Sequence, residues 1–229
     1  MIKKFEENIN YFFNNKEIIK EALTHSSYAN ETKDNNVRFN ERLEFLGDSV
    51  LSLVISNYLF KKFPDIPEGQ LTKLRAKIVC EPSLADVAKS IELGKSLKLG
   101  HGEEMTGGRS RTSILADGFE AVLAAIYLDN DFETVEKFIL DIMESKINQA
   151  VSGDLLLDYK TRLQEIIQSQ TTKNLNYQIY DEKGPDHNKT FYVHVMLEDK
   201  ILGSGEGSNK KEAEQQAAKE AIQEVDVYE

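Results

Sequence analysis

Residues 40–59 read NERLEFLGDSVLSLVISNYL, a stretch with the length and composition of an α-helix. At about 100° per residue, its apolar side chains fall on nearly every side of the helix. A helix that is apolar nearly all round is a buried helix. The sequence therefore predicts a core helix here, with Asn40 as its N-cap.

The first two turns of this helix interrupt the apolar pattern with an acidic stripe. Glu41, Glu44 and Asp48 are spaced i, i+3, i+7, and they lie within about 60° of one another around the helix. Three like charges on one stripe of a buried helix repel one another, and their removal from water is costly. They must therefore face water or hold something positive between them.

A second apolar stretch, residues 113–129 (SILADGFEAVLAAIYLD), repeats this feature. Asp117 and Glu120 are i, i+3 neighbours on one face, and Ala121 and Ala124 continue that face with small side chains that allow another helix to approach closely. Packing of the two helices would bring together four carboxylates: Glu44, Asp48, Asp117 and Glu120. Such a set of oxygen ligands suits a hard cation, Mg²⁺ first or Mn²⁺.

A simpler interpretation competes with the metal site, because one acidic stripe on a helix is more often a solvated face. Two such stripes inside otherwise apolar helices favour the metal. A purely structural ion fits poorly, since all-carboxylate clusters without Cys or His seldom hold a fold together.

The composition limits the possible class of protein. A chain of 229 residues, 40% of them hydrophobic, can form one large domain or two modest ones. Its net charge of −11 argues against a nucleic-acid partner. The single cysteine, Cys80, excludes an internal disulfide and indicates a reducing compartment. Neither a signal peptide nor a run of about 20 apolar residues occurs, so we expect a cytoplasmic protein without a membrane partner.

Helical patterns fill the first 150 residues. Residues 1–28 predict one or two short amphipathic helices, and residues 29–36, 63–69 and 93–102 predict loops. Further helices are expected over residues 71–79, 82–90, 113–129 and 132–149. No strand pattern occurs before residue 150, so residues 1–150 are expected to form an all-α domain.

The pattern changes after residues 150–154 (AVSGD), which predict a linker. A helix is expected over 159–168, followed by three strands over 176–180, 190–197 and 201–206, and a last helix over 209–225. Asn209 and Glu212 form an approximate capping box at the start of that helix. Residues 155–229 are therefore expected to form a small α+β domain in the order α-β-β-β-α.

These features resemble a known family. Residues 40–51 (NERLEFLGDSVL) resemble the signature stretch of the ribonuclease III family over all twelve positions. Residues 22–28 (ALTHSSY), 68–76 (EGQLTKLRA) and 107–121 (GGRSRTSILADGFEA) resemble that family's other blocks, in the same order. The order α-β-β-β-α is similar to the double-stranded-RNA-binding domain.

The resemblance implies a Mg²⁺-dependent endoribonuclease, with Mn²⁺ able to substitute and no small-molecule cofactor. It would cut both strands of double-stranded RNA to 5′-phosphate and 3′-hydroxyl ends, in rRNA and mRNA processing and turnover. The residues agree: no Ser-His-Asp or Cys-His arrangement of recognisable spacing occurs, and His25 lies far upstream of the acidic helices. Water activation by a metal is then expected.

The carboxylates receive separate roles. Metal ligands are assigned as Glu44, Asp48, Asp117 and Glu120. Asp48, which would also orient or deprotonate the attacking water, and Glu120, expected to be the most sensitive ligand, are assigned as catalytic. Glu41 and Glu68, the latter on a loop over the cluster, are expected to bind a second ion or RNA hydroxyls.

Residues 151–229 carry 9 Lys and Arg against 15 Asp and Glu, so this domain has no overall positive charge to attract RNA. The RNA contacts are therefore expected from a few local groups. A polar helix face suits the RNA minor groove with its 2′-hydroxyls, and that face comprises Thr161, Gln164, Glu165 and Gln168. Lys210 and Lys211, at the start of the last helix, are expected to bind phosphate with the free backbone N–H groups. The loop over residues 184–189 offers His187 to a minor groove.

One acidic cluster per chain and two strands per duplex predict a homodimer with a two-fold axis. Phe39, Phe45 and Leu46 flank the acidic stripe and are expected at the interface. Two other classes of function fit less well. A protein that only masks double-stranded RNA would lack the carboxylates, and a di-iron oxidoreductase in a helical bundle needs a Glu-x-x-His, which the chain does not contain.

Overall fold

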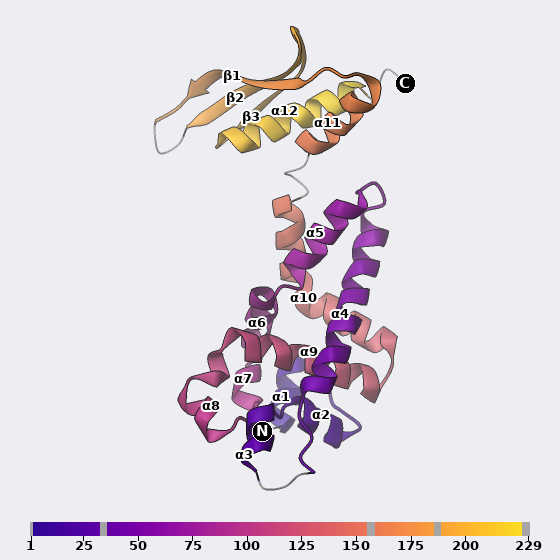
Figure 1. Cartoon of the computed structure of the whole chain (residues 1–229), viewed down its shortest axis with the longest axis vertical. Helices are drawn as coiled ribbons and strands as arrows, with labels where there is room; N and C mark the ends of the chain where they lie inside the picture. Colours follow the sequence, from indigo (N-terminus) through magenta and orange to yellow (C-terminus); the bar gives the residue numbers. More distant parts are fainter. Residues whose placement is uncertain (1, 33–35, 155–158, 186–188, 226–229) are drawn as a thin grey trace. The chain divides into compact units, whose positions relative to one another are not determined.

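The computed structural model describes residues 2–32, 36–154, 159–185 and 189–225 (Figure 1). The chain divides into two compact units, Met1–Ala150 and Val151–Glu229. The predicted fold class, an all-α domain followed by an α-β-β-β-α domain, is confirmed.

The first unit is a helical assembly (Figure 1). Its elements are α1 (Ile2–Ile9), α2 (Lys16–Ala22), α3 (Ser26–Glu31), α4 (Glu41–Lys62), α5 (Glu68–Ile78), α6 (Glu81–Ser90), α7 (Leu93–Ser96), α8 (His101–Met105), the 3₁₀ turn η1 (Gly108–Ser110), α9 (Thr112–Asp129) and α10 (Phe132–Asp154).

The core of this unit is built around α9, which contacts α4, α6 and α2. Between Ile114 and Ile126 every residue of α9 is buried except Asp117 and Glu120, which are half-buried. Within this buried stretch the two acidic residues are therefore the ones that reach solvent.

Helix α4 is buried on one side only. Leu43, Val50 and Val54 belong to the core, but the Phe45 side chain is 77% exposed, and Leu53 and Phe60 are also exposed. The prediction of a helix buried all round is therefore wrong for one face. By length and composition alone α4 could cross a membrane, but its other side packs against α9 as a core helix does.

Two details at the helix starts correct the sequence analysis. Asn40 does not cap α4: it has helical backbone angles, makes no side-chain cap hydrogen bond, and its side-chain Nδ2 is buried without a partner. Its backbone N–H instead donates to the Thr24 carbonyl at 2.9 Å. Glu68 does not lie on a loop, because it is the first residue of α5.

Helical structure also extends into segments that were expected to be irregular. Residues 93–102 contain α7 and the start of α8, whose N–H groups at His101 and Gly102 donate to the Glu31 carboxylate at 2.6 and 3.1 Å. Helix α10 continues through the predicted linker to Asp154, because Ala150 extends the buried series of Met143 and Ile147.

The second unit is a three-stranded antiparallel sheet in the order β1-β2-β3, with both helices on one face (Figure 1). Its elements are α11 (Tyr159–Gln170), β1 (Leu175–Lys183), β2 (Thr190–Leu197), β3 (Lys200–Gly207) and α12 (Lys210–Val225). Leu163, Val193 and Ala217 are fully buried between the layers. The Asn209 Oδ1 atom accepts from the Glu212 N–H at 3.0 Å, so the predicted cap of α12 is confirmed.

Candidate metal centre

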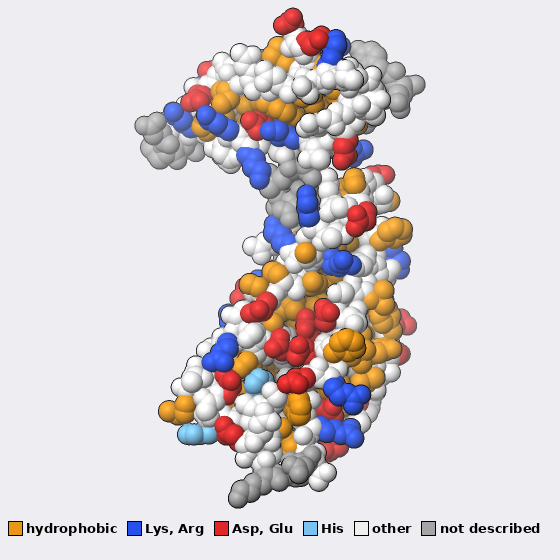
Figure 2. All heavy atoms as spheres, in the orientation of Figure 1, with side chains coloured by type: hydrophobic (Ala, Val, Ile, Leu, Met, Phe, Trp, Pro, Cys, Tyr) orange, Lys and Arg blue, Asp and Glu red, His pale blue; other side chains and the backbone are white. Residues whose placement is uncertain are grey.

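Three carboxylates converge where α4 and α9 cross. Glu44, Asp117 and Glu120 each offer an oxygen atom, and these atoms lie within 4.8 Å of one another. All three side chains are half-buried, and Figure 2 shows acidic side chains gathered on this face of the first unit. We call these three residues the acidic centre.

Gly47 determines how closely the two helices approach. A Cβ atom added at Gly47 would lie 1.9 Å from the Glu120 carbonyl oxygen, well inside any allowed contact. The glycine therefore lets the α4 backbone touch the α9 backbone one turn beyond Glu44. Without that contact the carboxylates of the two helices would not meet.

Burial and mutual repulsion both favour the protonated form of the carboxyl groups in the acidic centre. Burial first, and then the charges of Asp48, Glu44 and Asp117, raise the pKa of Glu120 to about 8. Burial followed by the charges of Asp117, Glu41 and Asp48 raises the pKa of Glu44. A divalent cation would supply the missing positive charge, so this set of oxygen donors fits a hard ion such as Mg²⁺ or Mn²⁺.

Asp48 and Glu41 lie beside the acidic centre and outside the 4.8 Å set. Both side chains are exposed, and Asp48 accepts from the Ser52 hydroxyl at 3.5 Å. Their charges still act on the centre, since Asp48 raises the pKa of Glu120 and Glu41 raises that of Glu44. Asp48 therefore acts on the acidic centre through its charge without belonging to the inner set.

Glu68 lies away from the acidic centre. Its carboxylate accepts from the Thr72 hydroxyl at 2.8 Å, and it lines a groove of about 350 Å³ with Leu53, Phe60 and Leu71. Among the described residues it is not one of the carboxylates that converge.

The sequence analysis missed that Glu81 and His25 lie near the acidic centre. Burial first, and then the charge of Glu81 at the start of α6, raise the pKa of Asp117, whereas His25 lowers it. His25 is therefore within electrostatic reach of Asp117 although it is remote in sequence. Its Nδ1 atom accepts from the Ser27 N–H at 3.2 Å and so caps α3. No spacing in the sequence could have revealed either neighbour.

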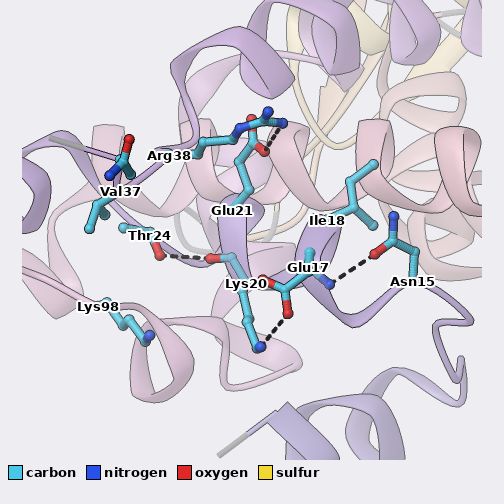
Figure 3. Close-up of a pocket in the computed structure, with 10 residues that line it drawn as sticks. Asn15, Glu17, Ile18, Lys20, Glu21, Thr24, Val37, Arg38 and Lys98 are labelled. Atoms are coloured by element: carbon cyan, nitrogen blue, oxygen red, sulfur yellow. Dashed lines mark hydrogen bonds and ion pairs between the residues drawn. The ribbon is translucent and has the colours of Figure 1, made fainter. Parts of the chain in front are cut away.

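A pocket of about 530 Å³ lies apart from these carboxylates, between α2 and the segment that leads into α4 (Figure 3). Its cations are largely engaged: Lys20 pairs with Glu17, and Arg38 lies 3.7 Å from Glu21. None of the acidic-centre residues lines it.

The expected RNA contacts lie on exposed surfaces of the second unit. The predicted contacts Thr161, Gln164, Glu165 and Gln168 are all exposed on α11. They lie opposite the buried Leu163 and Ile167. Lys210 and Lys211 are exposed in the first turn of α12. His187 lies outside the described residues.

Comparisons with known proteins agree with this architecture. Residues 15–146 match the family model "Ribonuclease-III-like", and residues 159–225 match "Double-stranded RNA binding motif". The chain is 54% identical over 227 residues to Ribonuclease 3 of Caldanaerobacter subterraneus subsp. tengcongensis, covering 99% of each chain. It is 51% identical over 223 residues to Ribonuclease 3 of Desulforamulus reducens, covering 97% of this chain and 91% of the relative.

A solved structure is similar to the first unit. The nuclease domain of ribonuclease III from Campylobacter jejuni has a TM-score of 0.59 and 42% sequence identity, covering 64% of this chain and 98% of that one. Its description names a region involved in dimer formation.

An acidic centre in an all-α domain, joined to a double-stranded-RNA-binding domain, defines an endoribonuclease specific for double-stranded RNA. The chain belongs to the ribonuclease III family, whose members are metal-dependent.

Proposed function

We propose that the chain cleaves double-stranded RNA at the acidic centre with Mg²⁺ as its ion, and that Mn²⁺ can substitute. The convergence of Glu44, Asp117 and Glu120 within 4.8 Å carries this proposal. Residues 1–150 form the catalytic domain, and residues 155–229 form the RNA-binding domain.

The three converging carboxylates act as ligands, and their protonation controls the site. The pKa of Glu120 is about 8 without an ion, so near neutral pH this carboxyl group carries a proton that a cation must displace. Asp48, exposed beside the centre, completes the ligand set and positions the attacking water through its carboxylate. When bound, the ion lowers the pKa of water and neutralises charge on the phosphate.

The chemistry of the products follows from attack on phosphorus and departure of the 3′ oxygen. The products are 5′-phosphate and 3′-hydroxyl ends. Glu41 holds a second ion or an RNA hydroxyl near Glu44, because its charge already reaches that residue. Such an enzyme would act in the cytoplasm on rRNA and mRNA precursors. The single cysteine supports a reducing compartment.

Cleavage with and without the ion tests this function. A long labelled RNA duplex should be cut in Mg²⁺ or Mn²⁺ and left intact in EDTA, and the ends of the products should accept ligation as 5′-phosphates. Mn²⁺ binding measured by calorimetry should weaken in Glu44→Gln and Asp117→Asn. Cleavage that persists in EDTA, or unchanged Mn²⁺ binding in both variants, would show that the carboxylates do not hold the ion.

We further propose that the active species is a homodimer. Helix α4 exposes Phe45, Leu53 and Phe60, and the groove beside it is lined by Leu53, Phe60 and Leu71. An isologous interface requires one surface that is complementary to itself, and an exposed ring next to an apolar groove on the same helix meets that need. Phe39 and Leu46, both half-buried, would lie at its border.

A further inference from the structure

The sheet of the second unit has a face that its helices leave uncovered. In β2 the buried Val193 and Val195 alternate with Tyr192 and His194. Because successive side chains of a strand point to opposite faces, Tyr192 and His194 lie on the face away from α11 and α12. Tyr180 of β1 contacts both of their rings. We call Tyr180, Tyr192 and His194 the ring cluster.

The rings of this cluster are held in a defined arrangement. Tyr180 and His194 are stacked, with ring centroids 3.9 Å apart and planes inclined by 10°. The Tyr192 ring is tilted against Tyr180 at 6.0 Å. The His194 Nδ1 atom lies 2.9 Å from the Ser204 hydroxyl of β3, which fixes the imidazole on the neighbouring strand.

The cluster is open to solvent and has a cation at its border. The Tyr180 side chain is 51% exposed, so part of its aromatic surface is uncovered. The Lys183 Nζ atom lies 5.1 Å from the centre of the Tyr192 ring and 3.1 Å from Asp181. Flat rings, hydrogen-bonding groups and a nearby cation are the groups that recognise an unstacked base and its phosphate.

We propose that the ring cluster binds unpaired bases of single-stranded RNA, which extend the Tyr180–His194 stack. The interior base pairs of a duplex cannot use this surface, because both of their faces are already stacked on neighbouring pairs. The expected duplex contacts Gln164 and Lys210 are on α11 and α12, on the other side of the sheet.

This site goes beyond the proposed nuclease function and needs no metal, so it can be tested apart from cleavage. The full-length chain carrying Glu120→Gln would be titrated in EDTA with labelled oligoadenylate of about ten nucleotides, a length within the range that single-strand binders cover. An abasic oligonucleotide of equal length has the same phosphates and no bases. We expect oligoadenylate to bind about tenfold more tightly than the abasic strand.

Variants locate the contact. Tyr180→Leu should weaken oligoadenylate binding about tenfold, whereas Tyr180→Phe, which keeps the ring, should retain it. Phe12→Leu, at an exposed ring of the nuclease unit, is the matched control and should have no effect. Binding of a short blunt duplex should be the same in all these proteins.

An oligoadenylate in which one adenosine is replaced by 4-thiouridine should photocrosslink to the peptides that contain Tyr180 or Tyr192. Equal affinity for the oligoadenylate and abasic strands, or unchanged affinity in Tyr180→Leu, would overturn the proposal. So would protection of β1–β3 from hydrogen exchange by a protein partner and not by the oligonucleotide, since the face would then be a protein interface.

Discussion

Glu120 of α9 meets α4 through both its backbone and its side chain. Its carbonyl oxygen contacts Gly47 and its carboxylate faces Glu44 and Asp117. Glu120→Gln keeps the shape and removes the charge. We expect cleavage to fall by more than a hundredfold, about 2.7 kcal/mol of transition-state stabilisation, while duplex binding measured by gel shift stays within about twofold.

The control for this variant is Glu144→Gln, because Glu144 is an exposed acidic residue on α10. It should cut at the normal rate. If Glu120→Gln retained more than a hundredth of that rate, Glu120 would not be an essential ligand.

The raised pKa of Glu120 also makes the stability of the metal-free chain depend on pH. Its pKa is about 8 in the fold against an ordinary value of 4.5, so between these pH values the folded chain binds the extra proton. Stability must therefore fall as pH rises from 4.5 to 8 and level off above it. Burial raises the pKa of Glu44 and Asp117 in the same direction.

Urea denaturation across this pH range is the measurement. The decline in the free energy of unfolding should be shallower in Glu120→Gln, which has no proton to lose there. Added Mg²⁺ should raise the melting temperature more at pH 8 than at pH 5, since ligands bind metal in their deprotonated form. Equal slopes in the two proteins would show that Glu120 ionises normally.

At the scale of elements, the contact between α4 and α9 depends on Gly47. Gly47→Ala places a Cβ 1.9 Å from the Glu120 carbonyl oxygen, so the helices must move apart. Overpacking of this kind costs about 1–3 kcal/mol, and the shift separates Glu44 from Glu120. We expect loss of cleavage together with a lower urea midpoint.

Gly69→Ala is the matched control for this change. Gly69 lies in the first turn of α5, and an added Cβ would meet nothing within 4 Å. Since alanine is the better helix former by about 1 kcal/mol, this variant should be at least as stable as the original chain. If Gly47→Ala behaved like Gly69→Ala, the close approach of the two helices would not be required.

Elements whose signals are local could be predicted from the sequence. The apolar periods of α4 and α9 and the alternation of β2 fixed their positions, and the Asn209 cap follows from its neighbours. The convergence of Glu44, Asp117 and Glu120 could also be anticipated. Asp117 and Glu120 share one face of α9, and the small residues that continue this face allow α4, which carries Glu44, to approach.

What could not be predicted depends on contacts between distant segments. Helix α8 is held by the Glu31 carboxylate, which accepts from the N–H groups of its first residues. His25 and Glu81 act on Asp117 from elements far away in the chain. Likewise, Leu53 and Phe60 join Phe45 on the uncovered side of α4, and the sequence analysis expected only Phe45 of these three at an interface.

At the scale of the whole molecule, the two units should be separable. The first unit has its own core around α9, so a chain ending at Asp154, the end of α10, should fold. It should cut duplexes at low salt but at least tenfold more slowly at about 150 mM salt, where phosphate contacts are weaker. Equal rates for both lengths at that salt would show that the second unit does not anchor the RNA.

Self-association is the other property of the whole molecule. Sedimentation equilibrium at micromolar concentration should give twice the 26.0 kDa mass of one chain. Phe45→Asp places a charge on the exposed apolar face of α4 and should shift the mass towards one chain. Phe12→Asp, which changes another exposed ring, should leave the dimer intact. A single-chain mass for the unaltered protein would rule out the dimer.

The contact at Gly47 also bears on how this protein could diverge. Every amino-acid substitution that arises from one base change in a glycine codon introduces a side chain, and an added Cβ at Gly47 meets the Glu120 backbone. The product of a duplicated gene with such a change would lose cleavage activity, while its second unit keeps a core of its own. A protein that shields duplexes from other nucleases is thus one base change away from this enzyme, and the reverse step is as short.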